Sequence, residues 1–258
     1  MTIATRSEIS LSPPITQQSF YDLIKQGFTN AGYTLFDEYT SGTDKFVIYS
    51  YIVDATKSFG INYLRIRVAS NLTISQQFYS SWSAASRTGT NGSTEIYFSA
   101  FNTNLQPTIT SLDAYPEYRF VLISQAALYA TLGFLVPQEK PDWWNLNSWN
   151  YGFLATDNTF TYFRASNLNP YSNAETITSL NNAYMNRVNP VTNRRDTLPG
   201  IILYAFGAQG IAAKTSDDLV SAAAGNLARY DLLTLPQDTK PYLLLNPANG
   251  GLAVRINQ

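Results

Sequence analysis

The chain has 258 residues, a formal net charge of −1, and neither histidine nor cysteine. Imidazole and thiolate are the usual zinc ligands and the usual members of nucleophilic triads and dyads, so the composition excludes those classes of catalytic and metal site. Hydrophobic residues make up 45% of the chain and charged residues only 14%. The chain can therefore bury a core, while its sparse charge opposes association only weakly.

The sequence gives no sign of a nucleic-acid or membrane partner. The most basic run is Asn193-Arg194-Arg195, which lies beside Asp196 and is too short to form a basic patch. No apolar run approaches the roughly 18 residues that span a bilayer. Residues 1–6 lack the apolar region of a signal peptide, so we expect synthesis in a cytoplasm.

Residues 1–14 are predicted to be extended, and an amphipathic helix follows them. Thr16 is a suitable N-cap and Gly32 a suitable residue just after the C-terminus. Between them, apolar side chains recur at spacings of three and four, as one face of a helix requires: Phe20, Leu23, Ile24, Phe28 and Ala31.

From Tyr33 to Phe101 the apolar period changes to two, which predicts β-strands. In the clearest strand, 61–68, one face carries Leu64, Ile66 and Val68, and the other carries Tyr63, Arg65 and Arg67. Residues 87–93 are predicted to form a loop. Further strands are predicted over residues 46–53, 72–79, 94–101, 118–124 and 128–136. The last of these segments also fits a short helix, but its content of Tyr129, Phe134 and Val136 favours a strand.

The second half of the chain is less regular. Residues 137–150 read as a loop rich in proline and tryptophan, and residues 165–199 as a long irregular stretch rich in asparagine. Residues 201–206 again have the apolar composition of an ordered segment. A short helix is predicted over 217–224, with Ser216 as its cap and with Asp217 and Asp218 at the positive end of its dipole. A hairpin closes the sequence, with strands at 242–245 and 252–256 around Asn249-Gly250-Gly251.

These elements predict an α+β fold with a mostly antiparallel β-sheet. An amphipathic helix stands near the N-terminus and a second, short helix near the C-terminus. Residues 1–137 form a helix-plus-sheet domain. Residues 138–258 combine the Trp- and Asn-rich loops, the short helix and the hairpin, either as a separate part or packed as one domain with the first.

The residues offer candidate interfaces and no candidate catalytic, cofactor or metal site. Trp143, Trp144 and Trp149 form either a sugar-stacking platform or, as we favour, a plug that covers a core or an interface. Arg65 and Arg67 either face solvent or pair with acidic residues of a neighbouring subunit. The carboxylates lack both the spacing of a glycosidase pair and a calcium-loop frame.

The long irregular stretch adds two more interface candidates. Its length without periodicity indicates a segment held by other chains, and Tyr171 and Tyr184 are available there as anchors. Near residue 214, Lys214-Thr215-Ser216 lacks the preceding glycines of a phosphate-binding loop. We therefore expect no cofactor.

Part of the sequence resembles uncharacterised virion structural proteins of tailed bacteriophages. The resemblance covers residues 16–137, and its stretches are Tyr63 to Val68, Phe78 to Gly92 with Trp82 and Thr88-Gly89, Tyr118 to Ser124, and Tyr129 to Pro137. It implies a non-enzymatic subunit of the tail, neck or baseplate, made in the host cytoplasm and located in the virion. Its implied partners are other virion proteins and further copies of itself, in a homo-oligomer or ring. The alternative is a receptor- or glycan-binding module of a phage tail, and a third, less favoured reading is a glycosidase that uses carboxylates.

Overall fold

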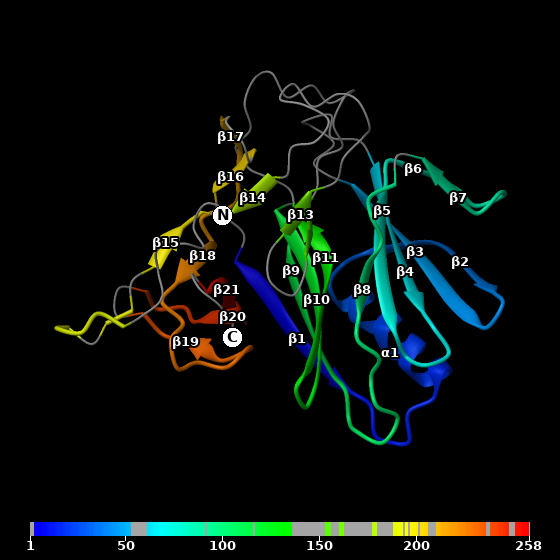
Figure 1. The fold of residues 1–258 in the computed structure, drawn as a ribbon, viewed down its shortest axis with the longest axis horizontal. Coiled ribbons are helices and arrows are strands. Elements are labelled where there is room, and N and C mark those ends of the chain that lie inside the picture. Colours follow the sequence, from blue (N-terminus) through cyan, green and yellow to red (C-terminus); the bar gives the residue numbers. More distant parts are fainter. Residues whose placement is uncertain are drawn as a thin grey trace.

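The structure, a computed structural model, is built mainly from β-strands arranged around one helix, α1 (Gln17–Asn30) (Figure 1). The helix packs on an eleven-stranded sheet and also contacts a five-stranded sheet. The described residues are 3–52, 61–90, 92–115, 117–135, 153–155, 160–162, 177–179, 188–192, 194–195, 197–200, 202–205, 210–235, 238–247 and 251–257.

The amphipathic helix is confirmed, with the predicted cap. Thr16 is the N-cap, and its side chain accepts a hydrogen bond from the backbone N–H of Ser19 at 3.1 Å. The Ser19 hydroxyl in turn accepts from the N–H of Thr16, which completes a capping box. Past the helix, Gly32 has a φ of +79°, a conformation that favours glycine.

The five-stranded sheet is an antiparallel meander in the order β2-β3-β4-β5-β8. Leu64, Ile66 and Val68 are fully buried on one face of β4, as the alternation predicted. A separate two-stranded hairpin extends from this sheet and occupies part of the predicted loop at 87–93. The strands are β2 (Thr34–Ser41), β3 (Asp44–Ile52), β4 (Ile61–Val68), β5 (Ile74–Tyr79) and β8 (Ile96–Phe98), and the hairpin consists of β6 (Ser81–Ser83) and β7 (Thr88–Thr90).

The larger sheet joins the two ends of the described chain. Its main path is β13-β12-β11-β10-β9-β1-β21-β18-β15, and β20 and β19 branch from β21. Its strands are β1 (Ala4–Ser10), β9 (Thr108–Ala114), β10 (Tyr118–Gln125), β11 (Leu128–Leu135), β12 (Phe153–Ala155), β13 (Phe160–Tyr162), β15 (Thr197–Pro199), β18 (Leu219–Ala222), β19 (Leu232–Leu233), β20 (Tyr242–Asn246) and β21 (Leu252–Asn257).

Strand β1 is the link in this sheet, because it runs antiparallel to β9 and parallel to β21, with Ala4 opposite Ile256. Strands from both sides of residue 137 therefore share one sheet, and the division at that residue stays a prediction. The C-terminal hairpin is confirmed as β20 paired with β21. A smaller sheet holds β14 (Ile177–Ser179), β16 (Ile202–Ala205) and β17 (Gly210–Lys214).

The predicted second helix is wrong. Residues 217–224 begin with a turn, in which the N–H of Leu219 donates to the carbonyl of Ser216 at 3.0 Å, and continue as β18. All four residues of β18 are buried, and the strand pairs with β15 on one side and β21 on the other. A surface helix needs an exposed face, which this segment does not have. The fold is thus mostly β, with one described helix.

The irregular stretch predicted over 165–199 also needs correction. It contains the short strands β14 and β15, which pair with β16 and β18. Strand β9 was not predicted, although it lies in the middle of the larger sheet. Its sequence, Thr108 to Ala114, contains few large apolar residues, so its pattern is weak.

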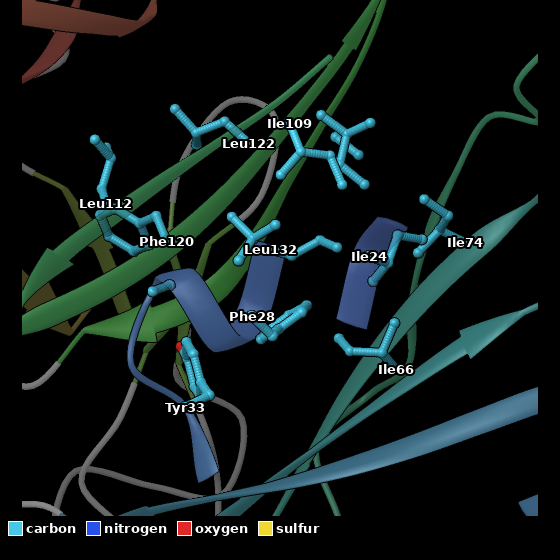
Figure 2. Close-up of a cluster of buried hydrophobic side chains, with 14 of the residues drawn as sticks. Ile24, Phe28, Tyr33, Ile66, Ile74, Ile109, Leu112, Phe120, Leu122 and Leu132 are labelled. Carbon is cyan, nitrogen blue, oxygen red and sulfur yellow. The ribbon is translucent and has the colours of Figure 1, made fainter. Parts of the chain in front are cut away.

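The core lies where the two sheets and the helix meet. Figure 2 shows Ile24 and Phe28 of α1 facing Ile66 and Ile74 of the five-stranded sheet, and the Phe28 ring stacks on Tyr49 with 4.4 Å between centroids. On its other side the helix approaches β9 so closely that a Cβ on Gly27 would lie 2.7 Å from Ile109 Cγ2.

Two buried polar contacts fix this arrangement. The Ser111 hydroxyl donates to the Gly27 carbonyl at 2.7 Å and so ties the helix to β9. Gln76 of β5 is fully buried and links the two sheets: its amide donates to the Thr131 carbonyl, and its side-chain oxygen accepts from the N–H of Gly133. Buried polar groups must be paired in this way, so these contacts also fix the spacing between the layers.

Candidate functional site

The face of the five-stranded sheet that points away from the core carries the two predicted arginines. Register places their neighbours on this same face, because side chains alternate between the two faces of a strand. We call it the outer face and define it by Asp44, Phe46, Ile48, Tyr63, Arg65, Arg67, Ser75, Gln77, Tyr79, Glu95 and Tyr97.

Arg65 contacts several groups of its own chain. Its guanidinium donates to Gln77 Oε1 at 2.6 Å and lies 3.3 Å from Glu95 Oε2. It also stands over the rings of Phe46 and Tyr79, at 5.5 and 5.6 Å from their centroids. Only 17% of its side chain is exposed, so Arg65 stabilises the sheet from within.

Arg67 also pairs with a carboxylate of its own chain. Asp44 Oδ2 lies 2.7 Å from Arg67 Nε and 2.6 Å from Arg67 Nη2. Burial lowers the pKa of Arg67, but the hydrogen bond and charge of Asp44 outweigh it, so the net pKa is raised. The acidic partners of both arginines thus come from the same chain, which neither sequence alternative included. Their place at an interface stays a prediction.

The β6–β7 hairpin is clamped onto the outer face by Trp82. The indole is 7% exposed, packs edge-on against Tyr79 with 5.2 Å between centroids, and donates from Nε1 to Asp37 Oδ2 at 2.9 Å. Burial raises the pKa of the Tyr79 hydroxyl. The hairpin approaches so closely that a Cβ on Gly89 would lie 2.1 Å from the Tyr79 ring.

Trp82 and Gly89 belong to the stretch 78–92 of the resemblance, but the sequence did not predict that they attach the β6–β7 hairpin to the outer face. The available signal was the position of Trp82 between two serines, at the buried point of an alternating strand, with a glycine seven residues later. Arg87 completes the clamp by standing 4.8 Å from the centroid of the Tyr39 ring. The β6–β7 hairpin is therefore attached to the outer face through Trp82 and Arg87.

Large apolar side chains stand exposed along the edges of the sheets. Both edge strands of the five-stranded sheet carry them, and so do two edge strands of the larger sheet. The residues and their exposed fractions are Leu35 (48%) and Phe36 (44%) on β2, Tyr97 (59%) on β8, Leu198 (47%) on β15 and Leu232 (42%) on β19.

A second polar cluster ties the C-terminal strands together. Arg255 of β21 pairs with Asp238 at 2.8 Å and with the buried Asp218 at 3.5 Å. Burial acts to raise the pKa of Asp238, but hydrogen bonds from the Lys240 N–H, Tyr242 and Arg255 lower it to about 2. Asp218, predicted at a helix N-terminus, instead anchors the turn before β18.

The described residues include no group of three or more carboxylates that could hold a metal ion. Within the same part of the chain, no helix is long and apolar enough to cross a membrane. Trp143, Trp144, Trp149, Tyr171 and Tyr184 lie outside the described residues, and their roles stay predictions.

The chain was compared with protein-family models, with curated proteins and with solved structures, and none of the three comparisons found a match.

Proposed function

We propose that the chain is a structural subunit that works through protein–protein contacts, in the virion of a tailed bacteriophage. The observation that carries the proposal is the set of exposed apolar side chains on the edge strands β2, β8, β15 and β19. An edge strand presents unpaired N–H and C=O groups, and an exposed apolar edge pairs readily with another chain. A subunit in an assembly has neighbours to cover such edges.

Strand β2 illustrates the argument best. It is eight residues long and contains neither lysine nor proline, two residues that commonly protect an edge from pairing. Its two acidic residues are engaged within the chain: Asp37 accepts from Trp82, and Glu38 lies 2.5 Å from Lys25 Nζ. The most exposed large side chains left on the strand are Leu35 and Phe36, which favour an apolar contact.

The outer face supports the same proposal. Its arginines are neutralised by Asp44 and Glu95, so the face presents mainly aromatic and uncharged groups, with Tyr97 the most open. Tyrosine and arginine are enriched in protein interfaces. The assignment to a phage virion rests on the resemblance of residues 16–137, with tail, neck or baseplate as the proposed location.

Two measurements test the proposal. Mass spectrometry of purified phage particles should detect the chain at a fixed copy number per particle. Sedimentation velocity of the purified chain should show association that increases with concentration. Absence of the chain from particles would reject the virion role, and a strict monomer that is also absent from every larger complex would reject a structural role altogether.

The alternative is the receptor- or glycan-binding module, whose candidate platform is Trp143, Trp144 and Trp149. A glycan array with the purified chain separates the two functions. Binding to one class of sugar that is lost in Trp144→Ala, with folding intact, would favour the alternative. No binding to any sugar on the array is the result that the structural proposal expects.

A further inference from the structure

The β6–β7 hairpin is an independent piece of structure on the outer face. Among the described strands, β6 and β7 pair only with each other, and Figure 1 shows them leaving the end of β5 as a separate ribbon. We call residues 81–90 the strap. Its hydroxyl contacts, Ser81 with Thr90 and Ser86 with Thr88, are internal. Moving the strap as a unit therefore breaks no backbone pairing of the larger sheets.

Trp82 is the anchor of the strap. Its indole packs with Tyr79 and Ile48 in a hydrophobic cluster separate from the main core. Ile48 is fully buried although it belongs to the outer face, because the indole covers it. The rest of the strap adds little to this contact, since residues 83–88 are all exposed. One large side chain thus supplies most of the apolar attachment.

The base of the strap is fixed, which confines movement to two short connections. The N–H of Ser93 donates to the Phe78 carbonyl at 2.9 Å, and the N–H of Phe78 donates to the Ser93 hydroxyl at 3.0 Å. Ser80 joins β5 to the strap on one side, and Gly92 lies between the strap and Ser93 on the other. The wide range of φ and ψ open to glycine suits Gly92 to a hinge.

Water can replace the polar contacts that hold the strap closed. The indole N–H of Trp82 donates to Asp37, which is half-buried, so both groups bind water once they separate and neither is left unsatisfied. The Arg87 guanidinium, over the Tyr39 ring, is exposed already. An element held by few buried apolar contacts opens at a lower free energy than the whole molecule unfolds.

We propose that the strap is a conformational device that opens as a unit while the five-stranded sheet stays folded. Closed, it keeps Ile48 and Tyr79 out of water. Open, it adds both side chains to the half-buried rings of Phe46 and Tyr63 on the outer face. The outer face then has two forms that differ in apolar area. This inference concerns the isolated chain and does not depend on the proposed function.

Gly89 offers a way to force the strap open. Its φ lies outside the left-handed region, so alanine fits the hairpin itself. In the closed strap, however, a Cβ at this position would lie 2.1 Å from Tyr79 Cδ1 and 2.4 Å from Cγ. The ring cannot easily move aside, because its hydroxyl donates to Gln77 Oε1 at 2.6 Å. Gly89→Ala is therefore incompatible with the closed strap and compatible with the open one.

Thiol labelling of the full-length chain measures the opening, because the sequence has no cysteine of its own. Ile48→Cys places a thiol beneath the strap. Ile66→Cys places one in the core on the opposite face of the same sheet, at an equally buried position. Each is combined with Gly89→Ala or with the control Thr88→Ala, which puts alanine on the exposed side of the same strand. Reaction with dithionitrobenzoate is followed in native buffer, and circular dichroism checks folding.

We expect the thiol at position 48 to react about ten times faster, or more, than the thiol at position 66. Gly89→Ala should raise the rate at position 48 about tenfold or more and leave position 66 unchanged, while Thr88→Ala should change neither.

Equal rates at the two positions would mean that Ile48 is uncovered only when the whole sheet unfolds, and would overturn the proposal. This comparison decides alone if Gly89→Ala does not fold. An effect of Gly89→Ala that is absent, the same at both positions, or matched by Thr88→Ala would overturn it as well.

Discussion

Replacing Gly27 by alanine sets two opposing effects against each other in the same helix. Glycine to alanine in a helix interior stabilises by about 1 kcal/mol through helix propensity. At this position, however, the new Cβ would lie 2.7 Å from Ile109 Cγ2 and 3.1 Å from Val121 Cγ1. Overpacking a close-packed site costs about 1–3 kcal/mol, so the net effect should be a loss of about 0–2 kcal/mol.

Urea denaturation followed by circular dichroism measures this loss. Thr29→Ala is the matched control, because Thr29 is exposed on the same helix and gains propensity without meeting β9. The control should gain roughly half a kcal/mol. If Gly27→Ala stabilises the protein as much as the control does, the close approach of α1 to β9 is refuted.

A double-mutant cycle locates the effect in one contact. Ile109→Ala alone should cost about 2–5 kcal/mol because it opens a cavity in the core. In that background the Cγ2 atom that Cβ of residue 27 would meet is gone, so Gly27→Ala should become neutral or stabilising. The coupling energy should reach about 1 kcal/mol or more. Additive effects would mean that residues 27 and 109 do not touch.

Three further changes test the outer face and the C-terminal cluster. Trp82→Phe keeps an aromatic side chain but leaves the Asp37 carboxylate without its indole donor. This change should lower the free energy of unfolding in urea by about 1–3 kcal/mol. Arg65→Glu places a carboxylate beside Glu95 and should destabilise the protein by about 3 kcal/mol or more. Adding Glu95→Gln should restore part of this stability, and no restoration would mean that residues 65 and 95 do not interact. The pKa of Asp238 is lowered from its ordinary 3.8 to about 2, so its stabilising effect is complete above about pH 4 and is lost as the pH falls toward 2. Thermal melts should show a loss of about 1 kcal/mol in this range, after solvent screening, and Asp238→Asn should remove that dependence.

Local signals predicted the elements whose structure is decided locally. Thr16 and the apolar spacing that follows it specify both the start and the face of α1. The alternation in 61–68 likewise gave the bounds and both faces of β4. In these segments one side of the element faces the core, so the period in the sequence matches the pattern of burial.

The predictions that were wrong or incomplete concern segments whose structure depends on residues far away in the sequence. Ser216 and two aspartates before an apolar run suit a helix start, but β15 and β21 take both edges of 219–222 and bury every side chain. The acidic partner of Arg65, Glu95, lies just before β8, and that of Arg67, Asp44, begins β3. Their proximity to the arginines depends on strand order, which no local pattern contains.

The parallel pairing of β1 with β21 has a consequence for synthesis. The ribosome makes β1 first and β21 after every other described strand, so β1 must wait through translation for the neighbour on its second side. A nascent chain that stalls before residue 252 leaves β1, β18 and β20 each without a neighbour that the complete chain supplies. Completion of the larger sheet therefore waits until residues 252–257 have been made, and products that end before β21 would be conformationally distinct from chains that contain it.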